Sequence, residues 1–185
     1  MLRDRWRVSK RVEEDWDSWQ DPHRAMIPGA VRNLHPTSLH EIGCGAGANL
    51  RLLRAVFPDL RLSGSDVCLD AVEWMQWQLG CEGQVGALPE DVHAEVMLSC
   101  YTMAYLDHDS VVKQVSRFTG RALILLEPHG NGEYTTIIRE DGSLMVPRCY
   151  HNYSRILTDL GWRCTQGAAI PPVDGLKVML TFERV

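Results

Sequence analysis

The sequence has no apolar run that approaches the roughly 18 residues needed to cross a membrane as a helix. Its opening stretch, MLRDRWRVSKRVEED, mixes basic, acidic and aromatic residues and lacks the apolar centre of a signal peptide. We therefore expect neither a membrane protein nor an exported one, and the sequence predicts a cytoplasmic protein.

Cysteine pairs with metal-binding or redox spacing are also missing. The six cysteines form no CxxC pair and no Cys/His cluster with the spacing of a zinc site, and most are expected to be free thiols. The net charge of −5 gives no broad basic surface for nucleic acid, although it allows a local basic patch. A chain of 185 residues, 45% hydrophobic and 23% charged, suits one globular domain.

From residue 38 onward the sequence contains an alternation of strand and helix patterns. Short apolar stretches alternate with stretches whose apolar residues recur at helical spacing. This order predicts a mainly parallel sheet with helices on both faces. Strands are expected at 38–43, 60–66, 83–89, 94–101 and 121–128, and helices at 48–57, 68–80 and 107–120, the last with Asp109 or Ser110 as its N-cap.

The two ends of the chain depart from this alternation. A long polar connection, 129–149, precedes an expected helix at 150–162 and two strands at 163–170 and 176–185. Their link is too short for a helical crossover, so these strands should pair antiparallel. Residues 1–36 are polar and rich in tryptophan and predict a helical extension interrupted at Pro28. This extension either packs on the core of the domain formed by 37–185 or forms a lid over a ligand site.

The stretch HEIGCGAGANL has three glycines at alternate positions, Gly43, Gly45 and Gly47, between an expected strand and an expected helix. Glycine at such a turn allows the backbone to approach a ligand closely, and ligands bind beyond the carboxyl ends of the strands in these sheets. Asp66 ends the next strand about 20 residues later, where an acid can accept both hydroxyls of a ribose. The turn and Asp66 together predict an adenosine-type ligand.

The choice between two such ligands depends on the glycine spacing and on Glu41. The NAD fingerprint is GxGxxG, whereas this turn places its third glycine one position early. Glu41 puts an acid near the turn, where it would repel a diphosphate and attract a cation. S-adenosylmethionine (SAM) carries an ammonium and a sulfonium and no phosphate, so the residue types favour SAM.

These motifs resemble those of the class I SAM-dependent methyltransferases. HEIGCGAGANL is similar to the family's first motif, Glu/Asp-x-Gly-x-Gly-x-Gly, LSGSD to the second, and VGALPEDVHAEVMLSCYTMAYLDH to the third and fourth. The resemblance spans about residues 38–185 and implies a Rossmann-like, doubly wound, mainly parallel seven-stranded sheet with a C-terminal antiparallel hairpin. In two places the chain departs from the pattern, with Gly86-Ala87-Leu88 where the family has an acid or polar residue near the adenine, and Glu95 where the fourth strand usually begins with Asp.

The resemblance also implies which residues bind the cofactor. The turn backbone would face the methionine part of SAM, Asp66 would hold the ribose, and backbone after the third strand would contact the adenine. Purely structural roles remain open for three of these residues: a local hydrogen bond for Glu41, a turn or helix cap for Asp66, and a tolerated small side chain for Cys44. The expected cofactor-binding residues are Glu41, Gly43, Cys44, Gly45, Gly47, Asp66, Val67, Ala87, Leu88, Ser99 and Cys100.

The methyl acceptor is less well defined by the residues. The chain lacks the Asn/Asp-Pro-Pro-Tyr motif of amino-directed DNA enzymes, the Pro-Cys nucleophile of cytosine carbon-5 enzymes and the acidic cluster of metal-dependent catechol enzymes, and no metal is expected. The catalytic candidates are His129, after the fifth strand, and Tyr101 and Tyr105, after the fourth. A histidine at the position of His129 titrates near neutrality and could serve as a base. His129 could instead be a rim residue bonded to a loop. Residues 107–109, Asp-His-Asp, are expected to be a solvated helix cap rather than a metal cluster.

We expect a small-molecule acceptor, because the chain has little length for a separate recognition domain. Three alternatives remain: a methyltransferase acting on RNA or protein, a non-catalytic SAM-binding subunit, and an NAD-dependent oxidoreductase. The first would be supported by a basic face formed by Arg3, Arg5, Arg7, Lys10 and Arg11.

Overall fold

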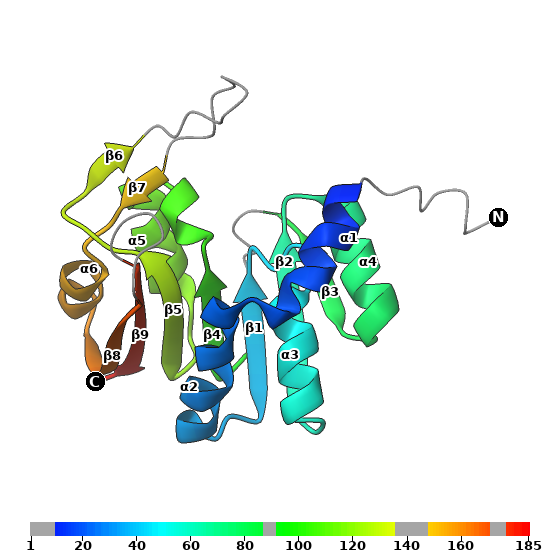
Figure 1. Ribbon diagram of the computed structural model, residues 1–185. Coiled ribbons are helices and arrows are strands. Elements are labelled where there is room, and N and C mark those ends of the chain that lie inside the picture. The colour runs from blue at the N-terminus through cyan, green and yellow to red at the C-terminus, as the bar shows by residue number, and fades with distance from the viewer. Residues whose placement is uncertain (1–9, 87–91, 136–147, 171–176) are drawn as a thin grey trace.

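A computed structural model of the chain describes residues 10–86, 92–135, 148–170 and 177–185. Its centre is a seven-stranded sheet of order β3-β2-β1-β4-β5-β9-β8 (Figure 1). The first five strands in that order pair in parallel, whereas β9 is antiparallel to both β5 and β8. The strands are β1 (Ser38–Ile42), β2 (Arg61–Asp66), β3 (Glu82–Val85), β4 (Val96–Cys100), β5 (Ala122–Pro128), β8 (Trp162–Ile170) and β9 (Lys177–Arg184).

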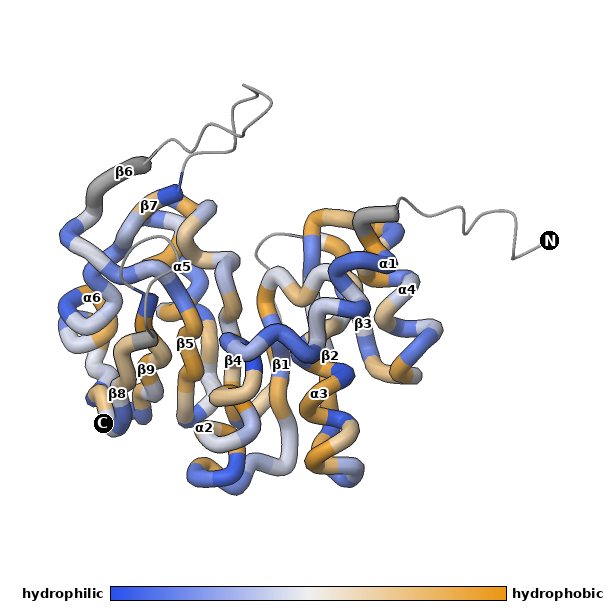
Figure 2. Tube along the Cα trace, in the orientation of Figure 1, coloured by the Kyte–Doolittle hydropathy of each residue, from blue (hydrophilic) through white to orange (hydrophobic). Residues whose placement is uncertain are grey.

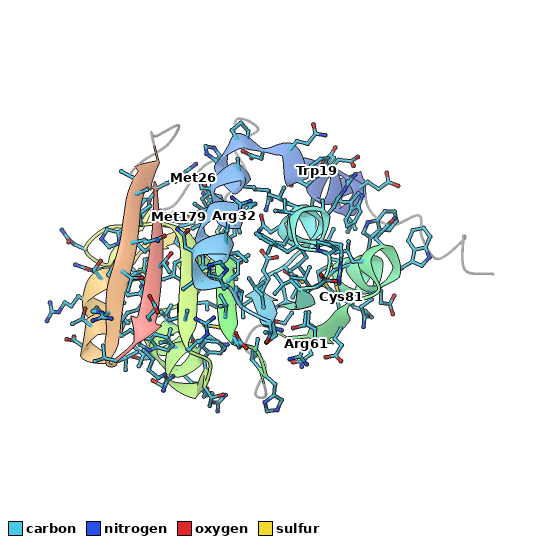
Figure 3. The ribbon with its side chains drawn as sticks, turned by 90° about the horizontal axis from the view of Figure 1, so that it is seen from below. Trp19, Met26, Arg32, Arg61, Cys81 and Met179 are labelled. Carbon is cyan, nitrogen blue, oxygen red and sulfur yellow. The ribbon has the colours of Figure 1, made fainter. Side chains whose placement is uncertain are left out.

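Helices cover both faces of the sheet, so the domain has three layers (Figures 1 and 3). Side chains of α2, α3 and α4 pack on one face, and those of α5 and α6 pack on the other. This arrangement confirms the doubly wound sheet with a reversed C-terminal hairpin. The helices that cover the sheet are α2 (Ile27–Leu34), α3 (Ala48–Val56), α4 (Leu69–Leu79), α5 (His108–Arg117) and α6 (Tyr153–Asp159).

The apolar runs of the central strands explain how the two faces are filled. In β4 and β5 every residue is buried, and successive side chains alternate between the two faces. Val96 and Leu98 pack with α2 and α3, whereas Met97 and Leu123 pack with α5 and α6. Each fully buried apolar side chain contributes about 1.5–3 kcal/mol. Figure 2 shows these central strands as largely hydrophobic along the Cα trace.

Several helix boundaries follow the signals in the sequence, and two differ from the expectation. Helix α4 ends at Gly80, which has a left-handed φ of 61°. The N-cap of α5 is Asp107, whose side chain accepts a hydrogen bond from the Ser110 amide, rather than Asp109 or Ser110. Pro28 lies in the first turn of α2, where its missing N–H has no helical partner to lose, so it starts that helix instead of interrupting it.

The polar connection after β5 contains a small antiparallel sheet that the sequence pattern did not predict. Strands β6 (Glu133–Thr135) and β7 (Arg148–Tyr150) pair across this connection (Figure 1). They are three residues each, too short to show a periodicity of their own.

The N-terminal region begins near the carboxyl ends of β1 and β2 and passes in front of β1 before it enters α2 (Figure 1). It consists of α1 (Lys10–Asp17) and the short 3-10 helices η1 (Ser18–Gln20) and η2 (Pro22–Met26). A further 3-10 helix, η3 (Met103–Tyr105), follows β4. No helix within the described parts of the chain has the length and apolar character of a membrane span.

Candidate functional site

The glycine turn lies where the strand order of the sheet reverses. Strand β1 pairs with β2 on one side and with β4 on the other, so the connections leaving these strands diverge. In open α/β sheets this point forms the crevice in which ligands bind. The turn that follows β1 is therefore placed at the ligand-binding edge.

The three glycines of the turn cannot be replaced without strain. Gly43, Gly45 and Gly47 have φ values of 65°, 51° and 92°, in the left-handed region that other residues rarely adopt. The turn is also tightly enclosed, because a Cβ on Gly43 would lie 2.0 Å from the Thr102 hydroxyl and one on Gly45 would lie 2.2 Å from an Asp15 carboxylate oxygen. At these three positions the turn therefore consists of backbone alone.

Glu41 lies beneath the turn on β1 and is 1% exposed. Its Oε1 accepts a hydrogen bond of 2.5 Å from the side-chain amide of Asn49. Its Oε2 is buried and has no hydrogen-bond partner among the residues that the structure describes. Burial raises the pKa of Glu41 to about 8, and the charges of Asp15 and Asp66 add to this rise. A cation near Oε2 would remove this cost.

Asp66 ends β2 beside the turn. One of its carboxylate oxygens accepts from the Gly45 amide at 3.0 Å, and the other accepts from the Cys68 amide at 2.8 Å. The next residue, Val67, is 70% exposed, and Leu69 and Val85 are also exposed, at 53% and 55%. These apolar side chains surround the ends of β2 and β3, whereas the predicted adenine contacts Ala87 and Leu88 lie outside the described residues.

The N-terminal segment covers the turn from above. Val12 of α1 is buried with Ala46 of the turn and Ala71 of α4. Asp15 accepts a hydrogen bond of 2.6 Å from the Ala46 amide. The segment is anchored to α3 by Arg51, whose guanidinium stacks on two tryptophan rings, 4.6 Å from Trp16 and 4.9 Å from Trp19.

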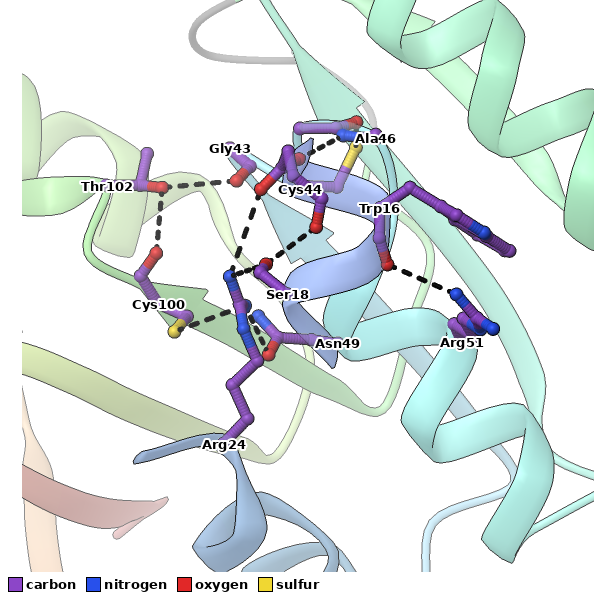
Figure 4. A network of polar contacts seen from close by, with 12 residues as sticks. Trp16, Ser18, Arg24, Gly43, Cys44, Ala46, Asn49, Arg51, Cys100 and Thr102 are labelled. Atoms are coloured by element: carbon purple, nitrogen blue, oxygen red, sulfur yellow. Dashed lines mark hydrogen bonds and ion pairs between the residues drawn. The ribbon is translucent and has the colours of Figure 1, made fainter. Parts of the chain in front are cut away.

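Arg24 reaches into the same region from η2 (Figure 4). Its Nη1 donates to the Asn49 side-chain oxygen at 2.7 Å and lies 4.0 Å from the Cys100 sulfur, and its Nη2 donates to Ser18 at 3.0 Å. Asn49 therefore connects Arg24 to Glu41 through the two ends of one amide. Arg24 links β1, α3, β4 and the N-terminal segment around the turn.

The loop after β4 is held by a second buried acid, Glu127. The carboxylate accepts hydrogen bonds from the Ser99 hydroxyl at 2.6 Å and from the amides of Thr102, Met103 and Ala104. Burial raises the pKa of Glu127, and these hydrogen bonds lower it in part. Ser99 is fully buried and donates its hydroxyl to Glu127, so its side chain is not available to a ligand.

The two cysteines expected at the site are buried thiols. Cys44 is 5% exposed and Cys100 is 7% exposed, and burial raises the pKa of both. They are therefore neutral at pH 7 and have no nucleophilic character. The six cysteines are all free, and the described parts of the chain contain no group of three His, Cys, Asp or Glu side chains able to hold a metal ion.

Tyr101, one of the predicted catalytic residues, adjoins the turn network, because it lies between Cys100, which contacts Arg24, and Thr102, whose hydroxyl donates to the Gly43 carbonyl. Its φ of 56° is unusual for a residue with a side chain, and such strain is often found at functional sites. Its ring lies 6.4 Å from that of His23, and the Lys177 ammonium lies 5.3 Å from its centre. Burial raises the pKa of Tyr101 to about 12, so it stays protonated at neutral pH. Its hydroxyl is buried without a partner in the described ranges.

The other two predicted catalytic residues make their contacts elsewhere. The Tyr105 hydroxyl accepts from Arg148 at 2.9 Å, and the ring is 40% exposed. His129 lies beside Tyr153, with 6.2 Å between the ring centres, and burial lowers its pKa. Tyr153 belongs to the hydrophobic cluster of the α5 and α6 face, so His129 is the more distant candidate.

Four residues of this network were not predicted: Asp15, Arg24, Asn49 and Glu127. Asp15 and Arg24 come from the N-terminal segment, and no spacing in the sequence relates them to the turn. Glu127 carried a usable signal, because an acid inside the apolar run LILLEP is rarely buried without partners.

Comparison with known proteins agrees with this architecture. No family model and no curated protein matches the chain. Solved structures do match at low identity. The mitomycin 7-O-methyltransferase MmcR shares 17% identity at a TM-score of 0.68, over 91% of this chain and 54% of that one. The magnesium protoporphyrin IX methyltransferase of Synechocystis PCC 6803, solved with bound SAM, shares 14% at a TM-score of 0.65, over 98% and 90%.

A third similar structure, the DhpI complex with S-adenosylhomocysteine (SAH), shares 14% identity at a TM-score of 0.61, over 94% of this chain and 96% of that one. The chain thus spans about half the length of the mitomycin enzyme and nearly all of the other two. It has the fold of the class I SAM-dependent methyltransferases, which confirms the expectation drawn from the motifs.

Proposed function

We propose that this protein transfers a methyl group from SAM to a small-molecule acceptor. The observation that carries the proposal is the glycine turn at the reversal of the strand order, with the buried and half-partnered carboxyl of Glu41 beneath it. An ammonium group is the natural partner for that oxygen, because it supplies both the hydrogen bond and the opposite charge.

The remaining residues of the turn fit the other parts of SAM. Each Asp66 oxygen has a second lone pair, so the carboxylate can accept ribose hydroxyls while it keeps its bonds to Gly45 and Cys68. The exposed Val67 and Leu69 offer apolar cover for an adenine face. The backbones of Gly43, Cys44 and Gly47, with Cys100 opposite, are assigned to the methionine part. When bound, SAM supplies an electrophilic methyl group on its sulfonium.

The acceptor would lie beside Tyr101, on the rim between the N-terminal segment and η3. Protonation states suggest two roles, one for Tyr101 and one for His129, which lies farther from the turn beside Tyr153. Tyr101, with its high pKa, is suited to donate a hydrogen bond that orients the acceptor. His129, with its low pKa, is neutral at pH 7 and suited to accept a proton. The N-terminal segment encloses one side of this rim, which favours a small acceptor over a macromolecule.

Isothermal titration of the full chain with SAM and SAH tests the cofactor assignment. Binding of both is expected, and absence of binding to either in folded protein would contradict the proposal. Detectable binding of NAD(H) instead would favour an oxidoreductase. Methyl transfer is then assayed with labelled SAM against small molecules bearing oxygen, nitrogen and sulfur nucleophiles, with RNA and protein as comparison acceptors. SAM binding without transfer to any acceptor would indicate a non-catalytic subunit.

The assigned roles of Tyr101 and His129 predict different kinetic changes. Tyr101→Phe should lower the rate by roughly 10- to 100-fold without moving its pH profile, since the lost group does not titrate near neutrality. His129→Gln should remove the acidic limb of the profile. An unchanged limb in His129→Gln would contradict its role as base.

A further inference from the structure

The guanidinium of Arg24 lies beside the glycine turn, where it contacts Asn49 and Cys100. Its side chain is 16% exposed, although it comes from the N-terminal segment rather than from the sheet. Nη1 and Nη2 are bonded to Asn49 and Ser18, while Nε is buried and has no partner among the residues described. Removing an arginine from water is costly unless its charge is matched.

A second buried atom without a partner among the described residues is the Glu41 Oε2, on the carboxyl that the Asn49 side chain joins to Arg24. Asn49 is 2% exposed, its nitrogen donates to Glu41 and its oxygen accepts from Arg24. Two buried atoms beside the turn, the Glu41 Oε2 and the Arg24 Nε, therefore have no hydrogen-bond partner in the described parts of the chain, and the carboxyl and guanidinium that carry them share one small side chain. An α-amino acid has the complementary pair, an ammonium and a carboxylate on one carbon.

The geometry points to Arg24 as the residue that binds the carboxylate of the amino-acid end of SAM, with Glu41 binding its ammonium. This inference rests on the proposed function and adds to it a residue from outside the glycine motif. The Arg24 Nη2 also lies 3.9 Å from a carboxylate oxygen of Asp15. Asp15 is itself held by the Ala46 amide, so it balances the guanidinium only in part.

The test compares SAM with decarboxylated SAM, which keeps the ammonium and the sulfonium but lacks the carboxylate. Dissociation constants for both are measured by isothermal titration on the wild-type chain and on Arg24→Gln. The wild type should prefer SAM by about tenfold or more, the scale of a charge-assisted hydrogen bond. Arg24→Gln should lose that preference to within about twofold, and Arg24→Lys should keep part of it.

Arg32→Gln is the matched control, because it makes the same change on an arginine at the far end of α2 that stacks on Phe57 (Figure 3). It should keep the wild-type preference. Equal weakening of both ligands by Arg24→Gln would show that Arg24 only supports the N-terminal segment and would overturn the inference. A wild type without a preference, or an unchanged preference in Arg24→Gln, would also overturn it. If the wild type binds neither ligand, the proposed function itself fails.

Discussion

Replacing Glu41 by glutamine should stabilise the fold and weaken cofactor binding at the same time. The side chain is buried on β1, and burial raises its pKa from 4.5 to about 8. The folded state therefore holds this proton more tightly than the unfolded chain does. Stability is highest below the unfolded pKa and is lost as the pH rises toward 8.

The size of the effect follows from the shift. Each pKa unit corresponds to about 1.4 kcal/mol, so the titration of Glu41 should lower the free energy of unfolding by about 3–4 kcal/mol between pH 5 and pH 8. Glutamine keeps the shape of the protonated acid and can still accept from Asn49. The stability advantage of Glu41→Gln over wild type should therefore be about 1 kcal/mol at pH 5 and about 4 kcal/mol at pH 8.

Urea unfolding of both proteins at the two pH values measures this difference directly. Other titrating groups, including His40, are common to both proteins and cancel in the comparison. A pH-independent difference would refute the reasoning, because Glu41 would then not be held protonated by the fold.

The same variant tests why the chain keeps a destabilising acid. Binding an ammonium beside Glu41 should expel its proton, so SAM titrations at pH 7 in buffers of different ionisation enthalpy should show release of about one proton. Glu41→Gln should release none and should bind about 2 kcal/mol more weakly, as expected for loss of a hydrogen bond between charged groups. Proton release by the variant equal to that of wild type would assign the proton to another group.

Three further predictions concern the turn and the sheet. Gly45→Ala should destabilise the fold by about 1–3 kcal/mol, because its Cβ would lie 2.2 Å from a carboxylate oxygen and its φ is 51°. The control is Gly29→Ala in α2, where a Cβ would have nothing within 4 Å and the change should be neutral or stabilise by up to about 1 kcal/mol. Thermal unfolding compares the two variants. Asp66→Ala should weaken SAM binding by about 1–3 kcal/mol, and unchanged affinity in the titration would remove Asp66 from the site. Burial lowers the pKa of His40 from 6.5 to about 4, so the neutral side chain contributes its full stability only above pH 6.5. About 3 kcal/mol of the free energy of unfolding should be lost through His40 as the pH falls from 7 to 4, and His40→Gln should reduce that loss in unfolding curves measured at acid pH.

The fold could be predicted from the sequence because its signals are local. Apolar runs such as 122–126 specify strands buried on both faces, and Leu50 and Leu53 mark the inner side of α3. The reversed C-terminal hairpin follows from a link too short to hold a helix. The strand pair β6–β7 escaped prediction because three-residue strands are selected by their partners and not by their own pattern.

The sequence by itself determined the glycine turn and its expected ligand class, since three left-handed positions beside an acid can be read within a few residues. Only the tertiary structure decided what surrounds that turn. Asp15 and Arg24 reach it from the N-terminal segment, and Asn49 joins Arg24 to Glu41. The physical reason is that these contacts depend on where a separate segment crosses the sheet, which neither propensity nor spacing specifies.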